Sequence, residues 1–97
     1  MKIFAWNEEK NRWLETERNI TFDDVVRAYA KRKILEVTPH HNIQKYPHQK
    51  IIYFLRRNYV YMVPFLDEGE RWFLKTIIPT RRYTKSYRKI IQKGEYG

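Results

Sequence analysis

The last quarter of the chain gathers the residue types that bind a polyanion. Its cationic residues are Lys75, Arg81, Arg82, Lys85, Arg88, Lys89 and Lys93. After Glu70, Glu95 is the only acidic residue. Tyr83 and Tyr87 lie among the cations one helical turn apart, so both can face the same side of a helix. This pattern predicts a positively charged surface that carries tyrosines, and RNA is the first ligand that it favours.

Arg81 and Arg82 are the strongest candidates for phosphate binding, and Lys75 is the third. The two arginines come where a final helix is predicted to begin, and the free amides of a helix N-terminus also attract anions. A planar guanidinium group suits a phosphate, whereas Lys75 on the preceding predicted strand supplies a point charge. A solvated helix end that binds nothing specific would have the same composition. Further contacts to nucleic acid are predicted for Lys85, Tyr87, Arg88, Lys89 and Arg57.

The histidines and Tyr83 are the candidates for proton transfer near neutral pH. His40, His41 and His48 lie in one turn-rich connector and titrate near neutrality without assistance. One of His40 or His41 is therefore a candidate general acid or base, although loop histidines are usually solvated. No carboxylate with ligand spacing accompanies them, so neither a metal nor a cofactor is predicted. Tyr83 can donate a proton or stack on a base if it is exposed, whereas burial is favoured for Tyr87.

The composition indicates one small domain. Ninety-seven residues suffice for a single core, so residues 1–97 are predicted to form one domain with a frayed tail at 93–97. The net charge of +9 favours polyanions or an acidic protein as partners. The chain has no cysteine, and no apolar run has the length of a membrane span. We therefore expect a soluble, cytoplasmic protein that does not associate with a membrane.

The elements that position these residues follow from hydrophobic periodicity and from breakers. Helices are predicted over 8–17, 22–32 and 81–92, and strands over 2–6, 34–37, 51–55, 59–66 and 71–78. Thr21 and Asp24 have the spacing of a capping box at the start of the second helix. Residues 56–58 form a tight hairpin turn, and 38–49 form the one long connector. Short loops force the last strands into an antiparallel meander, and we expect the helices to cover one face of it.

Several short motifs then resemble one family in their order and spacing. They are Trp6-Asn7, Lys10-Asn11, Phe22-Asp23-Asp24-Val25 and Ile77-Ile78-Pro79-Thr80-Arg81-Arg82-Tyr83-Thr84. Together they resemble the BrnT toxins, small ribonucleases of type II toxin–antitoxin systems, over roughly 4–87. The resemblance implies an α+β domain with a RelE-like antiparallel sheet, two N-terminal helices and one C-terminal helix. It also implies a toxin that cleaves RNA and inhibits translation.

The resemblance implies a metal-independent reaction and two kinds of partner. The 2′-hydroxyl of RNA attacks the adjacent phosphorus, and Lys75, Arg81 and Arg82 would stabilise the charge that develops there. His40 or Tyr83 would handle the protons. The partners would be RNA, ribosome-bound mRNA included, and a cognate antitoxin of the ribbon-helix-helix DNA-binding type.

The chain departs from the family pattern in two places. Glu17-Arg18-Asn19 replaces the family's Lys-His-Gly, so the family histidine has no counterpart. No acid follows Arg81 before Glu95, whereas the family has a glutamate in this helix. A mechanism that needs either residue therefore does not carry over. Two alternatives stay open: a non-catalytic module that binds RNA or DNA, and an inactive toxin-like domain that binds a protein.

Overall fold

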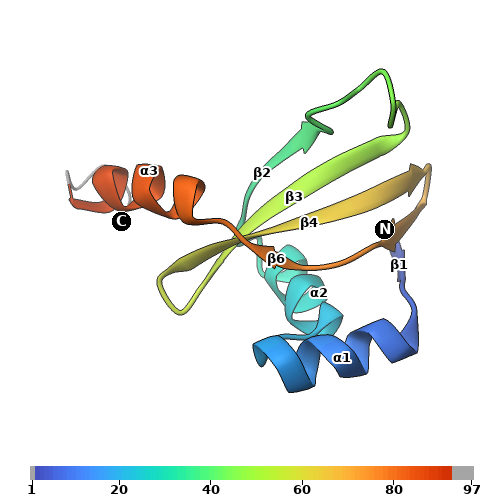
Figure 1. The fold of residues 1–97 in the computed structure, drawn as a ribbon, viewed down its shortest axis with the longest axis horizontal. Coiled ribbons are helices and arrows are strands. Elements are labelled where there is room, and N and C mark those ends of the chain that lie inside the picture. The colour runs from blue at the N-terminus through green and yellow to red at the C-terminus, as the bar shows by residue number, and fades with distance from the viewer. Residues whose placement is uncertain (1, 93–97) are drawn as a thin grey trace.

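Residues 2–92 fold as three helices around a six-stranded sheet (Figure 1). The computed structural model describes residues 2–92, with the backbone alone at 90–92, so the predicted tail at 93–97 lies outside the described residues. In chain order the elements are β1 (Ile3–Ala5), α1 (Glu8–Arg18), α2 (Phe22–Ala30), β2 (Ile34–Pro39), β3 (Gln49–Arg56), β4 (Tyr59–Glu68), β5 (Arg71–Leu74), β6 (Ile78–Pro79) and α3 (Arg81–Gln92). The predicted α+β class, with two N-terminal helices and one C-terminal helix, is confirmed.

The sheet is antiparallel except at one edge. The strands run in the order β1-β5-β4-β3-β2, and β6 also pairs with β4. The predicted meander forms β3, β4 and β5, and the β3–β4 hairpin keeps one register from Arg56 opposite Tyr59 to Gln49 opposite Leu66. β1 pairs with β5 in parallel. Parallel neighbours need a long connection, and the two N-terminal helices and the rest of the sheet provide it.

The predicted strand over 71–78 is interrupted, and this is a correction. β5 ends at Leu74, which pairs with Phe65, and β6 begins at Ile78, which pairs with Met62. Three residues, 75–77, therefore face two residues of β4. Pro64 lies in that gap and accepts a hydrogen bond from the Lys75 N–H at 2.8 Å, but it has no N–H to donate in return. The ladder breaks there for that reason, and Lys75 lies in a connector instead of in a strand.

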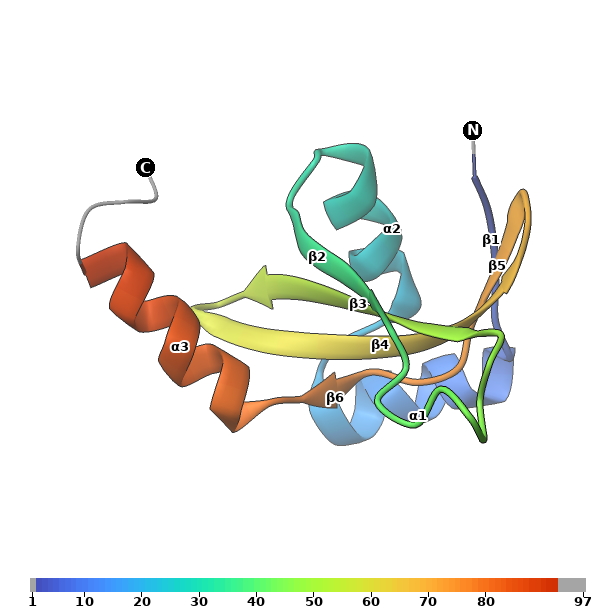
Figure 2. The same cartoon turned by 90° about the horizontal axis from the view of Figure 1, so that it is seen from above.

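The helices do not cover a single face, which corrects a second expectation. Alternate residues of β3 point to opposite faces of the sheet. Ile52 and Phe54 belong to a core that α1 and α2 complete through Leu14, Phe22 and Val25. Ile51 and Tyr53 belong to a second, smaller core with Val60, against which Tyr83 and Tyr87 of α3 pack. α3 therefore lies on the other face, and Figures 1 and 2 show it at one end of the sheet.

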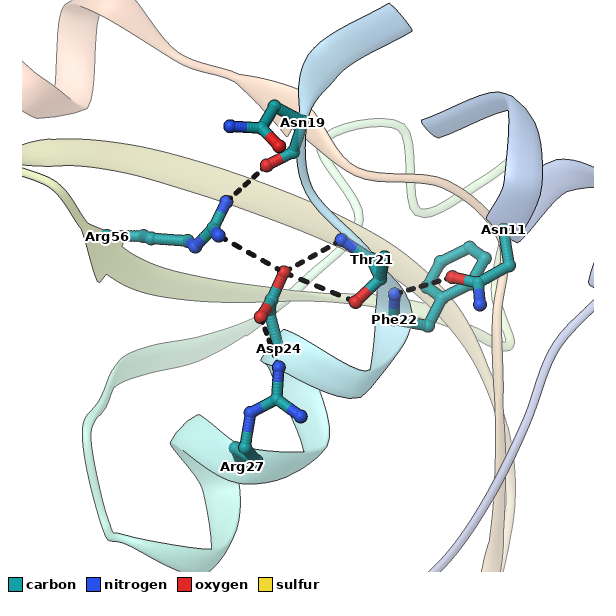
Figure 3. Close-up of polar contacts among 7 residues, drawn as sticks. All are labelled: Asn11, Asn19, Thr21, Phe22, Asp24, Arg27 and Arg56. Carbon is teal, nitrogen blue, oxygen red and sulfur yellow. Dashed lines mark hydrogen bonds and ion pairs between the residues drawn. The ribbon is translucent and has the colours of Figure 1, made fainter. Parts of the chain in front are cut away.

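One carboxylate holds the corner between α1, α2 and β3 together (Figure 3). Asn19 ends α1 in the left-handed region, with φ of 52°. Asp24 accepts the Thr21 backbone N–H at 2.8 Å, which confirms the predicted capping interaction. Arg56, at the end of β3, donates to the Asn19 carbonyl at 2.6 Å and lies 3.6 Å from Asp24. The hairpin turn that follows Arg56 is thereby tied to the helical layer.

The described helices are short, at 9 to 12 residues. Within residues 2–92, none has the length and apolar character needed to traverse a lipid bilayer.

Candidate nucleic-acid interface

The start of α3 is hydrogen-bonded to β4. Thr80, just before the helix, donates its N–H to the Val60 carbonyl at 2.9 Å. The Val60 N–H in turn donates to the Thr84 hydroxyl at 2.9 Å, and this hydroxyl donates to the Thr80 carbonyl at 2.7 Å. Thr84 is only 2% exposed, so these bonds are shielded from water. They fix the first turn of α3, and with it the positions of Arg81 and Arg82.

The cations of α3 share the side of the helix that faces solvent. At 100° per residue, they centre on the side opposite Tyr83 and Tyr87, which pack toward the sheet. All of them are exposed: Arg81, Arg82, Lys85, Arg88 and Lys89. We call these five residues the cationic face of α3. Among the residues that the structure describes, none of the five forms an ion pair.

The charge at the start of α3 opposes the helix dipole. The first turn has no acidic residue, whereas α1 and α2 each have two there. Arg81 and Arg82 therefore stand at the positive end of the dipole, an arrangement that is mildly destabilising in the free protein. A bound phosphate would offset both the dipole and the two guanidinium charges. This geometry is what an anion site at this end of the helix requires.

Arg57 extends the cationic face across to the β3–β4 turn. Arg57 and Asn58 both have positive φ, 54° and 62°, which is the conformation of a two-residue type I′ hairpin turn. Arg88 donates to the Asn58 carbonyl at 3.2 Å, so the turn lies beside the middle of α3. Arg57 is exposed, whereas the neighbouring Arg56 is held by Asp24 and Asn19. Only the second of these two adjacent arginines is free to contact a ligand.

A groove of about 280 Å³ lies between α3 and strands β2 to β4. Its lining residues are Leu35, Glu36, Tyr53, Val60, Tyr83, Ser86 and Tyr87. The rings of Tyr53 and Tyr83 pack with centroids 4.3 Å apart. Tyr83 is therefore half-buried at the edge of the groove, between the second core and the solvent. One side of the Tyr83 ring packs on Tyr53, so only the side that lines the groove is available to a ligand.

Tyr53 carries an unusual hydroxyl at the floor of this groove. The residue is 1% exposed, and its hydroxyl has no hydrogen-bond partner of acceptable geometry among the described residues. Burial, and then the neighbouring Tyr83 side chain, raises the pKa of Tyr53 to about 12, whereas the nearby Thr38 side chain acts to lower it. Tyr53 therefore stays protonated at neutral pH. It can serve as a hydrogen-bond donor but not as a base.

Glu36, like Tyr53, lines this groove and was not predicted from the sequence. It is exposed on β2, opposite Tyr53 in the strand register. The register shifts between Ile34 and Glu36, and this bulge lets Leu35 and Glu36 both line the groove. The available signal was a single acid in an otherwise apolar predicted strand, 34–37.

His40 and Lys75 do not join the groups on α3. His40 follows β2, and its N–H bonds to the carbonyl of Gln49, which pairs with Leu66 of β4. Thr80, just before α3, bonds instead to Val60 of β4. Six residues of β4 separate these positions, which is about 20 Å. His40 accepts the Asn42 N–H at Nδ1, 3.0 Å away, and packs on Tyr46. The structure thus places His40 far from Arg81.

Lys75 is nearer to α3 but still separate. Its backbone bonds to Pro64, four residues from Val60 along β4, which corresponds to about 13 Å. Its exposed Nζ lies 5.7 Å from the ring centre of Phe73. Of the predicted phosphate ligands, the structure brings together Arg81 and Arg82, with Tyr83 between them and the groove.

No match was found when the chain was compared with protein-family models, with curated proteins and with solved structures.

Proposed function

We propose that this protein is an RNA-cleaving toxin of the type II toxin–antitoxin kind. One observation carries the proposal: the five exposed cations of α3 have no acidic partner in the described chain, and they flank a groove with tyrosines on its walls. A surface of uncompensated positive charge beside aromatic rings suits single-stranded RNA, which is bound through its phosphates and its bases. The fold has the two N-terminal helices, the largely antiparallel sheet and the C-terminal helix that the resemblance to BrnT toxins implies.

In this proposal Arg81 and Arg82 hold the scissile phosphate at the start of α3. Their guanidinium groups stabilise the negative charge that develops as the 2′-hydroxyl attacks the phosphorus. The half-buried Tyr83 lies next to them and is the proton-transferring residue on α3. The remaining cations of α3 and Arg57 bind the flanking phosphates. The antitoxin of the proposed system would cover this same surface with acidic side chains.

Inducible expression in bacteria tests the toxin proposal. The unmodified protein should arrest growth, stop a cell-free translation reaction and shorten its RNA. The double variant Arg81→Ala/Arg82→Ala should relieve all three effects, because both side chains are exposed and contribute to binding instead of to folding. The matched control is Arg12→Ala/Lys31→Ala, which removes two exposed cations elsewhere. Unimpeded growth together with intact RNA would exclude a ribonuclease toxin.

The separation of His40 from α3 favours a second candidate, a non-catalytic RNA-binding module. About 20 Å of β4 separates the strand positions beside which they lie, so His40 does not assist the groups at Arg81. Such a module needs only the cationic face and the groove. It would bind RNA with a steep dependence on salt and would leave the strand uncut. Gel analysis of labelled RNA after incubation with the purified protein separates the two candidates.

A further inference from the structure

The groove beside α3 has features that the cationic face does not explain. Phosphate contacts need only exposed positive charge. The groove instead presents a carboxylate, an enclosed phenol and aromatic walls: Glu36, Tyr53, Tyr83 and Tyr87. Its volume of about 280 Å³ is at the lower end of small-molecule sites and suits one ring system better than a whole nucleotide.

The hydroxyl of Tyr53 is the first sign of a missing ligand atom. A buried polar group without a hydrogen bond is costly, and native proteins keep few of them. Tyr53 lines the groove, so a ligand atom that accepts a hydrogen bond there would satisfy it. Because its phenol remains protonated, the atom that it seeks is an acceptor.

Glu36 supplies the complementary acceptors. Glu36 and Tyr53 are opposite one another on β2 and β3, which places their Cβ atoms about 5 Å apart. In the described chain Glu36 forms no ion pair, so both carboxylate oxygens are available. The bulge in β2 adds Leu35 to the same wall. Bulges of this kind commonly re-aim a side chain at a functional site.

We propose that the groove is a subsite for one unpaired guanine of the RNA strand. The Watson–Crick edge of guanine presents an acceptor, O6, followed by two donors, the N1–H and the N2 amino group. Tyr53 donates to O6, and Glu36 accepts from N1 and N2. Adenine and uracil lack the two adjacent donors, and cytosine has only its amino group. Tyr83 and Tyr87 flank the base, as aromatic side chains do in single-strand recognition.

This subsite rests on the proposed binding of RNA by the cationic face of α3, and it adds a base preference to it. The strand's phosphates would follow the exposed cations while one base turns inward to the groove. Affinity would then come mainly from α3, and selectivity from Glu36 and Tyr53.

Fluorescence anisotropy with short 2′-O-methyl RNAs tests the subsite without cleavage, because the attacking hydroxyl is blocked. The probes are an all-uracil strand and strands in which one uracil is replaced by guanine, inosine or 7-deazaguanine. The unmodified protein should bind the guanine and 7-deazaguanine strands about tenfold more tightly than the all-uracil strand. Inosine lacks the N2 amino group and should lose most of that gain.

Two variants assign the preference to the groove. Glu36→Gln should remove the guanine preference and leave the affinity for the all-uracil strand nearly unchanged. The control Glu17→Gln makes the same charge change on α1, on the other face of the sheet, and should keep the preference. Tyr53→Phe should weaken guanine binding several-fold without loss of stability, because it removes only an unpartnered hydroxyl.

The outcomes separate the subsite from the proposed function. Binding of every strand with equal affinity would overturn the guanine subsite and leave RNA binding intact. A guanine preference that survives in Glu36→Gln would also overturn it, because the preference would then arise elsewhere. Failure to bind any strand at low salt would overturn both proposals together.

Discussion

Asp24 shows how much one carboxylate contributes at the scale of a residue. Burial alone would raise the pKa of Asp24, but other contacts outweigh it. The hydrogen bonds from the Thr21 backbone and Arg27, with the positive charges of Arg56 and Arg27, hold the pKa below its ordinary value of 3.8. A carboxyl whose pKa is lower in the folded state than in the unfolded chain stabilises the fold when it is ionised. That contribution is present above the ordinary pKa and is lost as the pH falls through the folded-state pKa.

Asp24→Ala should therefore destabilise the protein by about 2 kcal/mol at neutral pH. The difference from the unmodified protein should shrink as the pH falls below 3.8 and through the lower folded-state pKa of Asp24, because Asp24 is then protonated in both states. Urea unfolding followed by circular dichroism at each pH measures it. Asp23→Ala, at the exposed neighbouring position, is the control and should change little. A pH-independent difference would show that the ionised carboxylate contributes nothing.

Some acid sensitivity should remain in that variant. The hydrogen bonds from Lys50 and from the Gly69 backbone also lower the pKa of Asp67. The sign is the same as for Asp24, so the stabilisation from Asp67 is likewise lost on acidification. Asp67 lies at the surface, where solvent screens its pair with Lys50.

At the scale of the element, the docking of α3 decides whether the cationic face and the groove exist together. Among the described side chains of α3, Tyr83 and Tyr87 make the apolar contacts with the second core. Thr84 adds the buried hydrogen bond to Val60 that fixes the first turn. A helix of this length is marginal without tertiary contacts. The cationic face and the groove therefore both depend on the attachment of α3 to β4.

Thr84→Val is nearly isosteric and should leave the Val60 N–H buried without an acceptor. We expect a loss of about 1–3 kcal/mol in the free energy of unfolding, measured by urea titration. Thr16→Val, at an exposed position of α1, should lower the free energy of unfolding by only about 0.5 kcal/mol or less. RNA affinity should fall in Thr84→Val but not in Thr16→Val. Equal stability of the two variants would mean that the Thr84 bond does not hold α3.

At the scale of the whole molecule, the net charge of +9 is distributed unevenly. α1 and α2 begin with acidic residues, whereas α3 has none in its first turn. Charge that is merely spread over a protein attracts any polyanion weakly, whereas a concentrated stripe defines a binding surface. The arrangement of charge, more than its total, should therefore govern RNA binding.

Two variants of equal net charge test that distinction. Lys85→Ala/Lys89→Ala removes two cations from α3, and Lys31→Ala/Lys33→Ala removes two exposed cations that follow α2. The negative slope of log affinity against log salt should become shallower by about 1.4 in the first variant, if each lysine contacts one phosphate of a single strand. It should change little in the second. Equal changes in the two slopes would show that total charge, and not α3, determines binding.

Interactions between residues close in the sequence determined most of the helices and strands, and they also determined the cationic face of α3. Hydrophobic periodicity predicted the three helices, and turn chemistry predicted the β3–β4 hairpin, because both depend on neighbours within one or two turns. The exposed cations of α3 could also be read from the chain, since helical spacing puts them opposite Tyr83 and Tyr87. The break at Pro64 was not predicted, because it depends on which strand pairs with the proline.

Only the tertiary structure decided what lies beside what. Adjacent arginines differ in role because Arg56 reaches Asp24, 32 positions away in the chain, whereas Arg57 points from a turn into solvent. Glu36 meets Tyr53 through strand register, and His40 is carried to the far end of the sheet by the same pairing. Sequence spacing encodes contacts within an element, but contacts between elements depend on how strands pair and on which face a helix packs.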